Sequence, residues 1–230
     1  MAETQPRDAA DIAYLANLLS EAKIDPDLLA EVSGLLGWRV TPGRPSVRKG
    51  EFGEIVIAAI LEEFEGYIVP VKKLRYQIDP EQTLPGNDLL CMAFADDGSL
   101  ESLLFVECKL RTTRDLPAGT DAHEQLLDDR ERGFADILTF IIARLYEQES
   151  PLLPLLTDYL RIRAASGHSY GIGLVWESSQ WDERVLGRVA ALDPLLDPLA
   201  ITVTGVSGLT GLVDEVFDQA GVALVDDELS

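Results

Sequence analysis

The chain has 230 residues, 47% of them hydrophobic, so it can bury a core of the size that one α/β domain needs. This composition argues against a disordered chain, and no apolar run approaches the roughly 18 residues that a membrane span requires. Two cysteines, Cys91 and Cys108, cannot form the multi-bridge framework of a small secreted domain. Because the first residues also lack the basic and apolar pattern of an export signal, we expect a soluble, cytoplasmic protein with reduced thiols.

The formal net charge of −21 argues at first against a nucleic-acid protein, because phosphate binding requires lysine and arginine. The charge is unevenly distributed, however. Residues 1–38 carry two basic and seven acidic side chains, and residues 115–230 carry seven and 21. Residues 39–114 carry ten basic and twelve acidic side chains, so this central region is the least acidic part of the chain.

Two short amphipathic helices are predicted before residue 40, at residues 8–21 and 26–36. Residues 41–46 then hold two prolines and a glycine, which is typical of a linker. We therefore expect a small helical hairpin at residues 1–40 and one larger domain at residues 41–230.

The apolar positions of the larger domain predict a helix, three strands, two helices and then alternating strands and helices. The predicted helices span residues 51–64, 123–147 with a weak point at Gly133, 152–163, 182–191 and 209–219, and the predicted strands span residues 67–78, 88–95, 100–110, 172–177 and 200–206. This order predicts an α/β fold in which a central mixed sheet is flanked by helices.

The strongest functional prediction comes from the hairpin whose turn contains Asp97 and Gly98, since an Asp-Gly pair favours a two-residue turn. Such a turn pairs residues whose numbers sum to 195, and Asp88 and Glu107 satisfy this sum. Two carboxylates opposite each other are destabilising unless a divalent cation compensates them. Strand alternation places Lys109 on the same face as Glu107, which completes a plausible site for metal-assisted phosphodiester hydrolysis. The alternative is that Glu107 and Lys109 form an exposed strand pair while Asp88 ends a turn.

These residues resemble the PD-(D/E)XK nuclease superfamily, with residues 84–88 (Leu-Pro-Gly-Asn-Asp) as the first half of the motif and residues 106–109 (Val-Glu-Cys-Lys) as the second. The proline stands three residues before Asp88, whereas the motif has it adjacent. The resemblance implies a restriction-endonuclease-like core with a small N-terminal helical addition. It also implies that Asp88, Glu107 and the backbone carbonyl of Cys108 bind Mg²⁺ or Mn²⁺, and that Lys109 assists the attacking water.

The superfamily often adds a glutamate from the first core helix, and residues 50–54 (Gly-Glu-Phe-Gly-Glu) offer two candidates. We favour Glu54, which directly precedes the apolar helical run, over Glu51 at the predicted helix start. Residues 49–114 also resemble the nuclease subunit of the Hachiman anti-phage system, which shares the Gly-Glu-X-Gly-Glu helix and the Glu-X-Lys strand.

The sequence thus predicts a Mg²⁺- or Mn²⁺-dependent nuclease that acts on DNA, with RNA as the alternative, in anti-phage defence. Basic side chains near the acidic cluster could follow a nucleic-acid backbone, namely Arg44, Arg48, Lys49, Lys72, Lys73, Arg75, Arg111 and Arg114. Because the chain as a whole is acidic, we expect a protein partner such as a helicase, or self-assembly. The competing interpretation is a catalytically silent subunit that keeps the fold and acts by protein–protein interaction.

Overall fold

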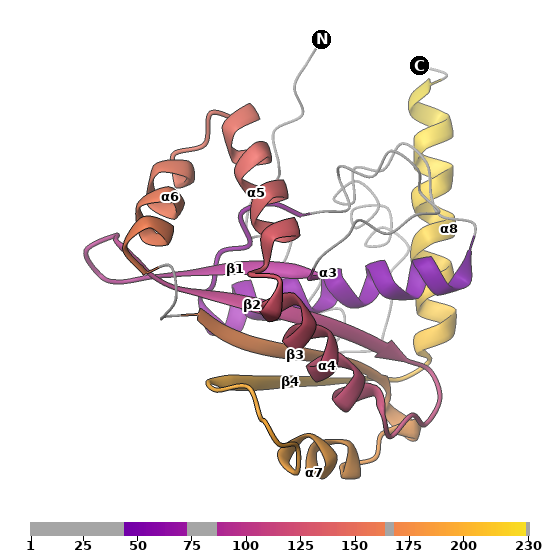
Figure 1. Ribbon diagram of the computed structural model, residues 1–230. Helices are drawn as coiled ribbons and strands as arrows, with labels where there is room; N and C mark the ends of the chain where they lie inside the picture. The colour runs from indigo at the N-terminus through magenta and orange to yellow at the C-terminus, as the bar shows by residue number, and fades with distance from the viewer. Residues whose placement is uncertain (1–43, 73–86, 164–167, 229–230) are drawn as a thin grey trace.

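In the computed structural model the described residues are 44–72, 87–163 and 168–228. The predicted hairpin at residues 1–40 lies outside them. The elements in chain order are α3 (Pro45–Glu65), β1 (Leu89–Phe94), β2 (Leu100–Arg111), α4 (Ala118–Glu131), α5 (Ala135–Glu147), α6 (Leu152–Arg163), β3 (His168–Glu177), the 3₁₀ turn η2 (Ser178–Gln180), α7 (Arg184–Ala190), β4 (Leu199–Val206) and α8 (Leu209–Glu228) (Figure 1).

The described part of the chain contains one mixed sheet of four strands in the order β1-β2-β3-β4. Strand β1 pairs antiparallel with β2, whereas β3 and β4 continue the sheet in parallel. The α/β fold with a mixed central sheet and flanking helices is therefore confirmed. The predicted strand at residues 67–78 forms only a single bridge, Ile68 to Met92, up to residue 72, and its remainder lies outside the described residues.

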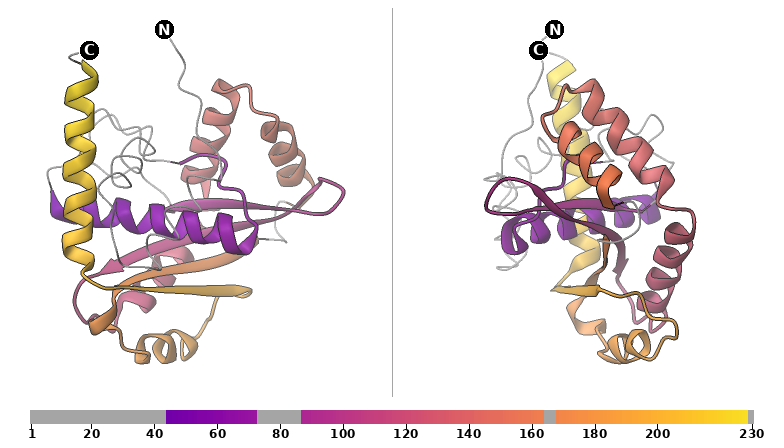
Figure 2. Two further views of the ribbon diagram at one scale, coloured as in Figure 1. Left: turned by 180° about the vertical axis from the view of Figure 1, so that it is seen from behind. Right: turned by 60° about the vertical axis from the view of Figure 1, so that its left-hand side comes forward.

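Helices cover both faces of the sheet, and each face has its own hydrophobic core (Figures 1 and 2). Helices α3 and α8 pack on the face to which the even-numbered residues of β2 point, such as Val106, Cys108 and Leu110. Helices α4 to α7 pack on the opposite face, where Leu103 and Phe105 point. Strand alternation therefore turns Glu107 and Lys109 toward the layer that contains α4.

Helix α3 begins earlier than predicted, because proline is favourable in the first helical turn and Pro45 stands there. Its close approach to the sheet depends on small residues. A Cβ atom added to Gly173 of β3 would lie 2.6 Å from the Cγ1 atom of Ile57. Helix and strand can therefore be this close only because residue 173 is glycine.

The long helix predicted at residues 123–147 is two helices, α4 and α5. Gly133 and Phe134 both adopt positive φ angles, 68° and 51°, which ends the α-helical path. Phe134 is nevertheless buried and stacks on Phe105 with ring centroids 3.8 Å apart. This packing compensates for the unfavourable backbone of a non-glycine residue and redirects the chain between the two helices.

Candidate active site

The hairpin that carries Asp88 and Glu107 has the predicted register but a different turn. Residues 89–93 of β1 pair with residues 102–106 of β2, and their numbers sum to 195. The turn itself has three residues, 96–98, because the Ala95 amide donates to the Ser99 carbonyl and Gly98 adopts a φ of 80°. A register shift between Ala93 and Phe94 then brings residues whose numbers sum to 195 opposite each other again. The two-residue turn was therefore wrong, whereas the alignment that points Asp88 toward Glu107 is confirmed for the neighbouring pairs.

Asp88 lies immediately before β1, at the point where β2 loses its antiparallel neighbour. Because β1 begins at Leu89, the backbone of β2 beyond Val106 has no strand partner on that side among the described residues. The Cys108 amide instead donates a 2.6 Å hydrogen bond to Asp88 Oδ2. In a strand the N–H and C=O groups of one residue point to the same side, so the Cys108 carbonyl also faces this open edge. The cysteine side chain is free and buried in the α3 layer.

Glu107 is only 6% exposed, so the interpretation of Glu107 and Lys109 as an exposed pair is wrong for the glutamate. Lys109 Nζ donates a 2.5 Å hydrogen bond to Glu107 Oε1. The pKa of Glu107 is nevertheless raised to about 7, first by burial and then by the negative charge of Asp88, against the opposing effect of Lys109. The carboxylate is therefore placed where its own negative charge is costly, as in sites built for a cation.

The helical glutamates lie in the layer on the other face of the sheet from Glu107 and Lys109. Glu54 contributes to the raised pKa of the Cys108 thiol, which places it near that face of β2. Glu51 is 1% exposed and stands in the second turn of α3, so its expected position at the helix start was wrong. The choice between Glu54 and Glu51 therefore stays a prediction.

Asp129 of α4 is an acidic residue near the site that the motif did not indicate. Its negative charge also raises the pKa of Glu107. Helical spacing could have found it, because Ala118, Ala122, Leu126 and Asp129 recur at intervals of three and four and are all buried. An aspartate at the end of a buried helical stripe is unusual.

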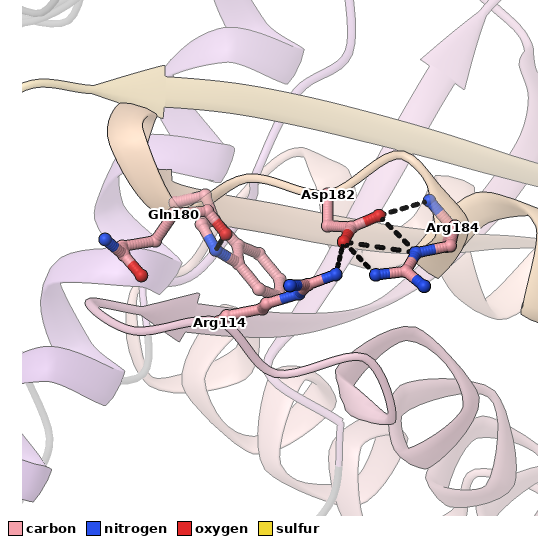
Figure 3. Close-up of polar contacts among 5 residues, drawn as sticks. Arg114, Gln180, Asp182 and Arg184 are labelled. Carbon is pink, nitrogen blue, oxygen red and sulfur yellow. Dashed lines mark hydrogen bonds and ion pairs between the residues drawn. The ribbon is translucent and has the colours of Figure 1, made fainter.

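Basic residues near the C-terminal end of β2 are bonded to acidic residues of the same chain. Arg111 pairs with Asp115, and Arg114 pairs with Asp182. Figure 3 shows that Arg184 binds the same carboxylate, with Nη2 lying 2.8 Å from Asp182 Oδ2. The neighbouring Gln180 carbonyl accepts a 3.0 Å hydrogen bond from Trp176 Nε1 of β3. The positive charge of these guanidinium groups is thus partly offset within the chain.

A second pair of basic residues lies at the start of α3. Arg48 forms a 2.7 Å ion pair with Asp218 of α8, and Lys49 donates to the Thr112 hydroxyl at 3.1 Å. Two residues of the predicted basic set, Lys73 and Arg75, lie outside the described residues.

Within residues 44–72, 87–163 and 168–228, no three Asp, Glu, His or Cys side chains converge closely enough to hold a metal ion as they stand. In the same part of the chain no helix is long and apolar enough to cross a membrane.

The sequence profile of the HamA family matches residues 11–175, which is well over half of the chain. This chain belongs to the HamA family. The matched region contains β1, β2 and all the candidate site residues, and it begins inside the predicted N-terminal hairpin. The chain is also 30% identical over 109 residues to the Hachiman protein HamA of Bacillus cereus. That alignment covers 47% of this chain and 37% of the relative, so the chain spans little more than a third of the relative's length.

Proposed function

We propose that this HamA-family chain is a metal-dependent nuclease that hydrolyses phosphodiester bonds of DNA in a Hachiman-type anti-phage defence system. The observation that carries the proposal is the alignment of Asp88 toward Glu107 at the open edge of β2, with Lys109 beside them. The succession of helix α3, hairpin β1-β2 and helix α4 also agrees with a PD-(D/E)XK core of the restriction-endonuclease type.

The residues at this edge have the chemistry that a hard divalent cation requires. Asp88, Glu107 and the Cys108 carbonyl would hold Mg²⁺ or Mn²⁺, because all three offer oxygen ligands. The raised pKa of Glu107 supports this assignment, since a nearby positive charge would relieve the cost of its burial. Such an ion, when bound, polarises the phosphate and acidifies a coordinated water.

Lys109 holds Glu107 and would have a second role in the reaction. Its ammonium is bonded to Glu107 Oε1, so it would stay beside the carboxylate that binds the cation. Because Lys109 is on the same strand face as Glu107, its ammonium would lie beside a phosphate held at this edge. There it orients the attacking water and offsets the negative charge that develops on the phosphate.

Cleavage assays on the purified chain test this proposal. Plasmid, linear duplex and single-stranded DNA are incubated with Mg²⁺, with Mn²⁺ or with a chelator. We expect metal-dependent cleavage, and a loss of about 10²-fold or more in Lys109→Ala, since the variant lacks a group that stabilises charge in the transition state. Arg144→Ala is the matched control, because Arg144 of α5 is also a partly buried cation in an ion pair, with Glu147 at 2.7 Å, and does not belong to the predicted basic set. Undiminished cleavage by Lys109→Ala would refute the assignment, and absence of cleavage on every substrate would favour the silent, partner-binding subunit.

A protein partner such as a helicase, or a second copy of the chain, belongs to the proposal. The net charge of −21 slows the approach of a polyanion, and Arg48, Arg111 and Arg114 are each bonded to an acid of the chain. A partner would supply the positive surface that the chain lacks. Titration of labelled DNA into the isolated chain at several salt concentrations should therefore give weak binding. Nanomolar dissociation constants at near-physiological salt, without partner or self-assembly, would refute this part.

A further inference from the structure

Asp129 is a buried carboxylate near the site that the nuclease motif does not include. It is 3% exposed, although it stands on a helix whose neighbouring residues, Asp128 and Arg130, are exposed. Its Oδ1 atom pairs with Arg132 one turn later. Its Oδ2 atom is buried and has no hydrogen-bond partner among the described residues. A buried carboxylate oxygen without a hydrogen-bond partner destabilises the folded protein, which indicates that the residue has a function.

The position of Asp129 connects it to the candidate site. It lines a recess together with Asn87, Arg132 and Phe134, and Asn87 directly precedes Asp88. Helix α4, which carries Asp129, packs on β2, which carries Glu107. The register of β1 and β2 aligns Asp88 with Glu107, so Asp129 of α4 lies near the corner of the sheet where these two acids stand.

We propose that Asp129 is a third carboxylate of the cation site, held by Arg132 until the ion binds. This inference rests on the proposed function and extends its ligand set to α4. Each acid is bonded to a different partner, Glu107 to Lys109, Asp129 to Arg132 and Asp88 to the Cys108 amide. Like charges in a buried corner repel one another, so a cation among these carboxylates would be favourable. Asp129 would contribute an oxygen to a divalent ion held there, directly or through a water.

The competing role for Asp129 is purely structural, as the acid that anchors Arg132 at the end of α4. The two roles differ in the binding of Mn²⁺ to the full chain without nucleic acid, measured by isothermal titration calorimetry. We expect Asp129→Asn to weaken Mn²⁺ binding by about tenfold or more, the range seen when groups that support a metal site are removed. Asp128→Asn is the matched control, because it removes the same charge from the adjacent exposed position, and it should change the affinity less than about twofold.

Glu107→Gln separates this inference from the proposed function. If Glu107→Gln abolishes Mn²⁺ binding while Asp129→Asn behaves like Asp128→Asn, the inference is overturned and the proposed function stands. If the unaltered chain binds no Mn²⁺, both are overturned.

Arg132→Ala provides a second measurement that does not depend on the folding of Asp129→Asn. Arg132 is largely exposed, so its removal leaves the core intact and frees the Asp129 carboxylate. We expect this variant to bind Mn²⁺ more tightly than Arg130→Ala, which removes an equal charge two residues away. Equal affinities of the two variants would overturn the assignment of Asp129.

Discussion

The Glu107→Gln substitution should stabilise the metal-free protein at neutral and alkaline pH. Glutamine has the shape of the protonated glutamic acid and cannot ionise. The pKa of Glu107 is raised from its usual 4.5 to about 7 by burial and by the charge of Asp88. Its ionised form is therefore disfavoured in the folded state, and the substitution removes that cost.

The pH dependence of this effect follows from proton linkage. Between pH 4.5 and about 7 the folded chain retains a proton that the unfolded chain has lost, so the contribution of Glu107 to stability falls as the pH rises. Below pH 4.5 the side chain is neutral in both states, and above about pH 7 it is charged in both. Between these two pH values the free energy of unfolding falls by about 3 kcal/mol, since each unit of pKa difference corresponds to about 1.4 kcal/mol.

Urea denaturation at a series of pH values, in the presence of a chelator, measures the effect. Glu107→Gln should match the unaltered chain near pH 4 and exceed its free energy of unfolding by about 3 kcal/mol at pH 8. Glu101→Gln, an exposed position on the same strand, should show no such trend. Addition of Mn²⁺ at pH 8 should make the unaltered chain more stable than Glu107→Gln, because the ion stabilises only the chain that binds it. A constant difference across the pH range would refute the reasoning, since it would show that Glu107 ionises normally in the folded chain.

Three further predictions test the fold and the site. Gly173→Ala should lower the free energy of unfolding by about 1–3 kcal/mol, because its Cβ atom would lie 2.6 Å from Ile57 Cγ1. Gly187→Ala is the control and should not destabilise the protein, because the space around this glycine is open; equal urea midpoints of the two variants would contradict the prediction. His123 accepts a hydrogen bond from the Leu196 amide, and burial lowers the pKa of its imidazole. The contribution of His123 to the free energy of unfolding should therefore be complete above pH 6.5 and should fall as the pH decreases from 6.5 to the folded-state pKa. His123→Gln should remove this trend in urea denaturation at pH 5 and 7.5, and an unchanged trend would exclude the histidine as its source. For the helical carboxylate, Glu54→Gln should reduce the cleavage rate more than Glu51→Gln, and the reverse result would transfer the role to Glu51.

The candidate site was predictable from sequence because it depends on local register. Alternation along β2 fixes the side of Glu107 and Lys109, and the hairpin fixes which residues of β1 lie opposite. The predicted register was correct although the turn was not, because the longer turn and the register shift beside Phe94 compensate each other. The shift restores the arrangement in which the apolar residues of both strands share a face, so core burial determined the final alignment.

The features that the sequence did not predict depend on tertiary contacts. The break between α4 and α5 requires Phe134 to adopt a positive φ, which becomes favourable only when its ring stacks on Phe105 of β2. Asp129 has a similar origin, since its role near Glu107 depends on how α4 lies across the sheet. The buried stripe of α4 marked its position, but no local pattern indicates which strand residue it meets.

Two of the three acids at the candidate site are paired with cations of the same chain, which under the proposed function would couple metal binding to nucleic-acid binding. Lys109 and Arg132 are bonded to Glu107 and Asp129, which reduces the charge that they can offer a phosphate. A divalent ion that takes the two carboxylates would release both cations at the same corner of the sheet. Because coupling between two ligands is reciprocal, the DNA strand would in turn strengthen ion binding. An acidic protein of this kind would bind its substrate well only where the metal is already in place, which limits unproductive contact with phosphate elsewhere.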